Sequence, residues 1–183
     1  MSRACRHISE SAQPKLRAMP TRALLLSLLA LLVLAAPASA TIVPGKGMAG
    51  VELSMCQERV IEILGVPDRT FGSNDVFGFV SRYYYNERGL KLEFRKGPGR
   101  CLVLGSIRTT KGQERTVEGV GKGTMRKTLR AKLRGEKCRT FNVEKKRHRI
   151  CWLGSFTPSK PITEFRIDSK GRVNNIRVAY VID

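Results

Sequence analysis

The sequence predicts an α+β protein of two tandem repeats, each a short helical segment packed on an antiparallel β-sheet. Three observations predict this class. A set of motifs recurs at a spacing of about seventy residues. Each copy begins with an apolar stripe of helical period, and each then changes to the alternating pattern of β-strands. The chain of 183 residues is long enough for this arrangement and too short for a large multidomain enzyme.

The repeat is detected from matches that keep the same order. The pattern from Met55 to Phe71 returns from Met125 to Phe141 at an offset of 70. Three shorter matches follow, namely Glu93-Phe94-Arg95 with Glu164-Phe165-Arg166, Gly99-Arg100 with Gly171-Arg172, and Ile107-Arg108 with Ile176-Arg177. The polar stretch Thr109 to Gly123 separates the copies. We therefore expect repeats at residues 41–110 and 111–183.

Residues 1–40 are predicted to be a bacterial-type secretory signal. Basic residues precede the apolar run Ala23 to Ala36, and a small-residue site ends at Ala40. The apolar run is too short to span a bilayer. Met19 is an alternative start of translation to Met1. We expect cleavage after Ala40, a secreted or extracytoplasmic protein, and no transmembrane span after cleavage.

Each copy is expected to begin with a helix. In the first, Ser54 is the predicted N-cap, the stripe runs from Cys56 to Leu64, and Gly65 ends the helix. In the second, Thr124 is the predicted cap and Gly135 the end, with a stripe of Met125, Leu129 and Leu133. Helices this short are marginal alone, so their apolar stripes must be buried.

The strands follow from period-two alternation. Leu90 to Arg95 places Leu90, Leu92 and Phe94 inward, and the turn Asn86 to Gly89 joins this strand to Val80–Tyr85. The second copy has strands at 162–168 and 173–182. Gly72 to Asp75 is expected to be a solvated loop. One face of each sheet is expected to cover the core and the other to face water.

Four cysteines remain after the signal, namely Cys56, Cys101, Cys138 and Cys151. An even number in an oxidising compartment favours two disulfides, and the residues alone leave three connectivities open. No Cys-x-x-Cys pair is present, so we expect no metal and no cofactor.

The motifs also carry a family resemblance. In the second copy they are Gly121-Lys-Gly-Thr-Met125, Leu133-Arg-Gly135 and Gly171-Arg-Val-Asn-Asn-Ile176. The first copy matches with Gly50 to Met55 and Leu64 to Pro67. The chain resembles tandem SmpA/OmlA-like domains of the β-lactamase inhibitory protein (BLIP) family. The resemblance implies a Cys138–Cys151 disulfide, which leaves Cys56 to pair with Cys101, and a protein-binding surface on the open sheet faces.

The candidate binding residues are aromatic and charged side chains expected on those open faces, a composition typical of interface hot spots. They are Tyr83, Tyr85, Lys91, Arg95, Trp152, Arg166 and Arg177. The alternative is that the tyrosines and Trp152 belong to the core. We expect the partner to be an extracellular or envelope protein that is bound in an inhibitor-like or assembly-factor role.

The charge favours a second function. The full chain has a formal net charge of +19, and residues 109–183 hold 19 basic and 7 acidic side chains. Such a field attracts anionic wall polymers or lipid surfaces, and no module for specific nucleic-acid recognition is present. An enzyme is not expected, because the single histidine after the signal, His148, has no catalytic partner in the sequence.

Overall fold

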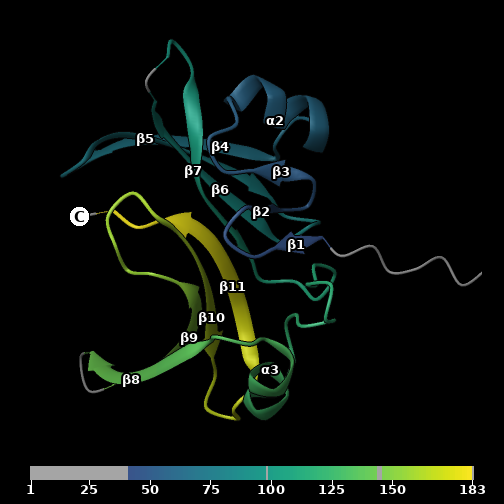
Figure 1. The fold of residues 1–183 in the computed structure, drawn as a ribbon. Helices are drawn as coiled ribbons and strands as arrows, with labels where there is room; N and C mark the ends of the chain where they lie inside the picture. The colour runs from purple at the N-terminus through teal and green to yellow at the C-terminus, as the bar shows by residue number, and fades with distance from the viewer. Residues whose placement is uncertain (1–40, 98, 144–145, 183) are drawn as a thin grey trace, which may run out of the picture. The chain divides into compact units, whose positions relative to one another are not determined.

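The computed structural model describes residues 41–97, 99–143 and 146–182. The predicted signal peptide and its cleavage site lie outside the described residues. Within them the chain forms two short helices and eleven strands (Figure 1). In chain order these are β1 (Ile42–Val43), β2 (Gly47–Met48), β3 (Val51–Glu52), α2 (Gln57–Leu64), β4 (Arg69–Asp75), β5 (Gly78–Tyr85), β6 (Leu90–Lys96), β7 (Leu102–Thr109), α3 (Arg126–Lys132), β8 (Lys137–Val143), β9 (Lys146–Gly154), β10 (Pro161–Ile167) and β11 (Val173–Tyr180).

The predicted α+β class with two separate sheets is wrong. The protein is mainly β, and eight strands form one antiparallel sheet in the order β4-β5-β6-β7-β11-β10-β9-β8. Strands β7 and β11 join the two halves, with Ile107 opposite Val178. Each half alone would leave a strand edge with unpaired backbone groups, and this pairing satisfies both edges. The division at residue 110 stays a prediction.

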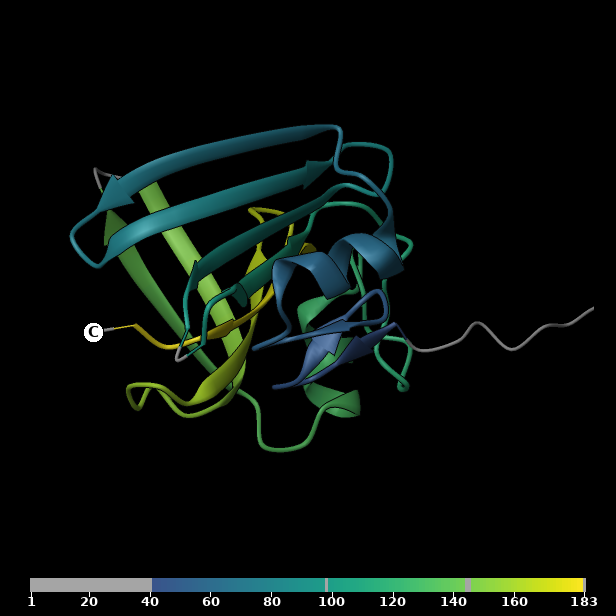
Figure 2. The same cartoon turned by 90° about the horizontal axis from the view of Figure 1, so that it is seen from above.

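A second sheet of three very short strands, β1-β2-β3, was not predicted. These strands have two residues each, which is too short for an alternation pattern. Figure 1 and Figure 2 show this small sheet on the same side of the large sheet as α2 and α3. The buried side chains Ile42, Met48 and Val51 join it to the common core.

One hydrophobic core fills the space between the large sheet and these elements. The large sheet contributes alternate side chains, including Leu92, Phe94 and Phe165, each with no exposed surface. Helix α2 contributes Val60 and helix α3 contributes Leu129, both also fully buried. The predicted inward orientation of Leu92 and Phe94 in β6 is therefore confirmed. In the described part of the chain, no helix covers the opposite side of the sheet.

The helix ends differ in part from those predicted. Cys56 and Met125, rather than Ser54 and Thr124, are the N-cap residues, and neither makes a side-chain capping bond. The Ser54 hydroxyl instead pairs with the Tyr180 hydroxyl at 2.9 Å. Gly65 ends α2 as predicted, with φ +84°. Helix α3 ends before Gly135, at Lys132.

Two disulfides are present, and both join the predicted pairs. Cys56–Cys101 connects the start of α2 to the start of β7, while Cys138–Cys151 joins directly opposed residues of β8 and β9. Gly72 to Asp75, expected to be a loop, belongs to β4, where Asp75 pairs with Gly78. Both faces of β4 are largely exposed, so its sequence shows no alternation.

Candidate functional site

The side of the large sheet opposite the core, which we call the open face, is the candidate functional site. Its central row crosses the middle strands: Lys91 of β6 lies opposite Arg108 of β7, and Arg108 lies opposite Arg177 of β11. The row continues through Glu164 of β10 to Trp152 of β9. Since directly opposed residues point to the same side of a sheet, these side chains share one face.

Five of the predicted binding residues lie on the open face. Lys91, Arg177 and Trp152 belong to the central row, and the remaining two occupy alternate positions of the same strands. Those two are Arg95, two residues beyond Glu93 on β6, and Arg166, opposite Asn175. The pattern of β6 and β10 was therefore sufficient to orient their charged side chains.

The predictions for Tyr83 and Tyr85 were wrong, because both point into the core. They are 8% and 5% exposed and lie opposite the inward residues Leu92 and Leu90. The Tyr85 hydroxyl donates a hydrogen bond to the Gly65 carbonyl at 3.0 Å. Burial raises the pKa of both tyrosines above the ordinary value. Neither side chain is available to a partner.

Tyr84 occupies the place on the open face that was assigned to its neighbours. It lies opposite Lys91 and Arg69, whose cationic groups are 5.8 and 5.9 Å from its ring centroid. Such distances fit cation–π contacts. Because β5 contains three consecutive tyrosines, its sequence does not show which of them point inward. The pairing of Tyr85 with the inward residue Leu90 across the predicted turn could have shown this.

Glu93 is held by two cations on the open face. Its carboxylate lies 2.9 Å from Lys91 Nζ and 3.3 Å from Arg82 Nε. Desolvation pushes the pKa of Glu93 upward, but the hydrogen bonds from Lys91 and Arg82 outweigh it, so the pKa lies below the ordinary value. This carboxylate is therefore ionised and already engaged within the chain.

Arg177 is likewise engaged. Its Nε donates a hydrogen bond to Ser106 Oγ at 2.9 Å, and its Nη1 lies 3.4 Å from Glu164 Oε2. Glu164 is buried, so this ion pair is sheltered from solvent. The side chain of Arg177 is thereby fixed at the centre of the face.

Arg108 is a site residue that the sequence analysis missed. Its pKa is lowered, first by desolvation and then by repulsion from Arg166 and Arg177. Its buried Nε has no hydrogen-bond acceptor within the described part of the chain. The repeat could have identified Arg108, because Ile107-Arg108 matches Ile176-Arg177. Of these two arginines, only Arg177 was predicted to be a binding residue. We call Arg108, Arg166 and Arg177 the arginine cluster.

An aromatic pocket of about 550 Å³ adjoins the central row. Two of its lining residues, Trp152 and Phe156, contact each other with ring centroids 4.9 Å apart in an edge-to-face arrangement. Its lining residues are Arg139, Phe141, Ile150, Trp152, Phe156 and Glu164. Phe141 and Phe156 are 36% and 53% exposed, so the pocket presents apolar surface to solvent.

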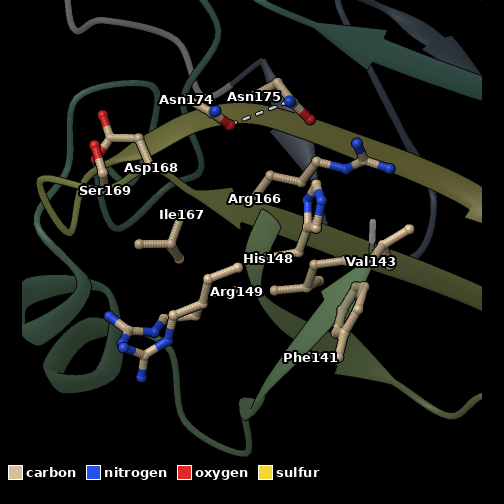
Figure 3. Close-up of a pocket in the computed structure, with 12 residues that line it drawn as sticks. Phe141, Val143, His148, Arg149, Arg166, Ile167, Asp168, Ser169, Asn174 and Asn175 are labelled. Atoms are coloured by element: carbon tan, nitrogen blue, oxygen red, sulfur yellow. Dashed lines mark hydrogen bonds between the residues drawn. The ribbon is translucent and has the colours of Figure 1, made fainter. Parts of the chain in front are cut away.

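A second hollow, of about 530 Å³, lies at the end of the face formed by β8, β9 and the β10–β11 turn. Figure 3 shows Arg166 between Asn175 and His148, with Phe141 and Val143 on the β8 side. The His148 ring stacks on Phe141 at a centroid distance of 5.7 Å. Phe141 lines both hollows and thus connects them.

The other end of the open face carries an exposed ion pair. Arg95 donates two hydrogen bonds to the Asp75 carboxylate, one of them at 3.0 Å. These bonds lower the pKa of Asp75 to about 2. The Arg95 guanidinium also lies 5.9 Å from the ring centroid of Phe77, which is 55% exposed at the tip of the β4–β5 hairpin.

One group of metal-ligand residue types was found among the described residues, namely Cys56, Glu58 and Cys101. The two sulfur atoms are bonded to each other, so they are not thiolate ligands. In the described part of the chain, neither helix has the length and apolar character that crossing a bilayer requires.

The fold and the site define a mainly-β protein with a disulfide in each half and a charged, aromatic open sheet face. No protein-family profile and no curated protein sequence matches the chain. A DUF4309 family protein from Bacillus subtilis has a similar structure, with a TM-score of 0.47 and 14% identity, over 74% of this chain and 88% of that chain.

A cysteine-rich secretory protein from Staphylococcus aureus is similar with a TM-score of 0.43 and 12% identity. The similarity covers 77% of this chain and 49% of that one. With TM-scores below 0.5, neither likeness assigns a fold family or a function. The resemblance to SmpA/OmlA-like domains stays a prediction.

Proposed function

We propose that this chain is a secreted, non-catalytic binding module that holds an extracellular or envelope protein on its open face. The observation that carries the proposal is the aromatic pocket beside the arginine cluster on the open face of the large sheet. Trp, Tyr and Arg dominate the binding energy of protein interfaces, particularly around a pocket that an anchor residue can fill. The two disulfides and the predicted signal support an oxidising compartment outside the cytoplasm.

A second candidate function is the binding of anionic wall polymers or lipid surfaces. The specific observation in its favour is α3, whose exposed side chains include Lys127, Arg130 and Lys132. This helix lies on the core side of the large sheet, away from the open face (Figure 1). Polymer binding would therefore use a different surface, and it would weaken steeply with salt.

An affinity pull-down from the envelope and medium of the producing cells tests the proposal. The protein and its Trp152→Ala variant are compared at low and high salt, with Val66→Ala as control. Val66 is 84% exposed and lies outside the open face. We expect a discrete protein that is retained at high salt by the unaltered chain and the control, and lost by Trp152→Ala. Retention of only a salt-eluted polymer would contradict the proposal.

A further inference from the structure

The arginine cluster brings three guanidinium groups together at the centre of the open face. Arg108 lies directly opposite Arg177 on the neighbouring strand, and Arg166 lies on β10, the strand on the other side of β11. Arg166 is two positions from Glu164, so it points to the same side of the sheet. The three groups therefore converge from adjacent strands on one patch.

The two carboxylates near the arginine cluster pair with Arg177 and with cations outside the cluster, and not with Arg108. Glu164 is engaged by Arg177, while Glu93 is engaged by Lys91 and Arg82. Arg108 lies between Lys91 and Arg177 and is also repelled by Arg166, and its buried Nε has no acceptor among the described residues. A buried donor without an acceptor costs free energy, so the Arg108 side chain is poorly compensated within the described residues. An incoming anion would relieve the repulsion among the three cations.

We propose that the arginine cluster is a receptor for a carboxylate carried by an acidic segment of the protein partner. This inference rests on the proposed function, because it names the chemistry of the partner that the open face holds. Arg108 and Arg166 are the residues that meet the carboxylate, since Arg177 is already held by Glu164 and Ser106. The planar fork of a guanidinium matches the two oxygens of a carboxylate.

The surroundings favour a protein segment over a phosphate polymer. Glu93 on β6 and Glu164 on β10 lie on either side of Arg108 and Arg177, so a long polyanion that crossed the face would also meet these two carboxylates. The aromatic pocket, which shares Glu164 with the central row, suits an apolar side chain next to the acidic one. Arg166 lines the adjoining hollow of Figure 3, which leaves space for the incoming group.

The test measures binding of capped hexaglutamate, capped hexaglutamine and linear polyphosphate to the full chain at physiological salt. Binding is followed by NMR through the arginine Nε–H signals. The test variants are Arg166→Gln, which alters an exposed side chain, and the double variant Arg108→Gln/Arg166→Gln. The matched control Lys127→Gln/Arg134→Gln removes the same charge from exposed positions at α3 and just beyond it.

We expect hexaglutamate to shift the Arg108 and Arg166 signals, with affinity falling about tenfold or more in the double variant and less than threefold in the control. Hexaglutamine should not bind. Equal losses in both double variants, or tighter binding of polyphosphate per charge, would overturn the proposal. If Arg108→Gln prevents folding, Arg166→Gln alone must still weaken binding more than the control. Carboxylate binding without a salt-resistant protein partner would contradict the proposed function and leave the receptor site intact.

Discussion

Replacing Leu129 by alanine should destabilise the protein strongly, although α3 has only seven residues. The Leu129 side chain is 0% exposed and belongs to the common core. Removing three buried carbon atoms costs about 2.4 kcal/mol at ~0.8 kcal/mol each. With the residual cavity included, Leu→Ala substitutions in cores cost about 2–5 kcal/mol of unfolding free energy, and the transfer cost lies near the lower end of that range. Alanine is the better helix former, so helix propensity cannot account for the loss.

Urea unfolding and a thermal melt measure this loss. At about 3 °C per kcal/mol for a domain of this size, Tm should fall by roughly 6–15 °C. Lys127→Ala is the matched control, because it alters an exposed side chain in the same helix and should change stability by less than about 0.5 kcal/mol. If the two variants had the same stability, the burial of α3 against the core would be refuted.

Three further perturbations probe other features. Replacing Cys138 and Cys151 by alanine should lower the unfolding free energy by about 3 kcal/mol in the chain-entropy account, since their sequence separation is 13; an unchanged urea midpoint would contradict this. Arg95→Gln should return the pKa of Asp75 from about 2 toward 3.8, as followed by NMR. Because the folded-state pKa is depressed, the stabilisation from this pair is present above about pH 4 and is lost as the pH falls toward 2. A pKa that stays near 2 would show that Arg95 is not the cause. Trp152→Ala should weaken partner binding by about 2 kcal/mol, roughly thirtyfold, measured on variant protein shown to be folded; an unchanged Kd would exclude Trp152 as an anchor.

Local patterns predicted the central strands correctly. Alternation fixed the inward side of β6, and the turn ending at Gly89 fixed its pairing with β5. The joining of both halves into one sheet could not be predicted in this way. Strands β7 and β11 are distant in the sequence, and the residue pattern of neither strand indicates which other strand it pairs with. The exposed strand β4 was also missed, since a strand solvated on both faces lacks alternation.

The candidate site was predicted where one strand face is clearly apolar. Lys91 and Arg95 alternate with buried residues and were placed correctly. Tyr83 and Tyr85 were placed on the wrong face, because tyrosine suits both a core and an interface, and Tyr84 between them gives no contrast. Arg108 escaped notice because a single arginine at the end of a strand reveals nothing of the other guanidinium groups that the sheet brings beside it.

The seam between β7 and β11 also constrains how the protein can fold. Strand β11 is the last strand among the described residues, yet it pairs on one side with β10 and on the other with β7. A chain synthesised from its N-terminus therefore keeps β7 unpaired on that side until β11 has been synthesised. Such a long-range contact slows folding and leaves an edge exposed to aggregation. Completion of the sheet thus depends on β11, and its removal would leave β7 and β10 each with an unpaired edge.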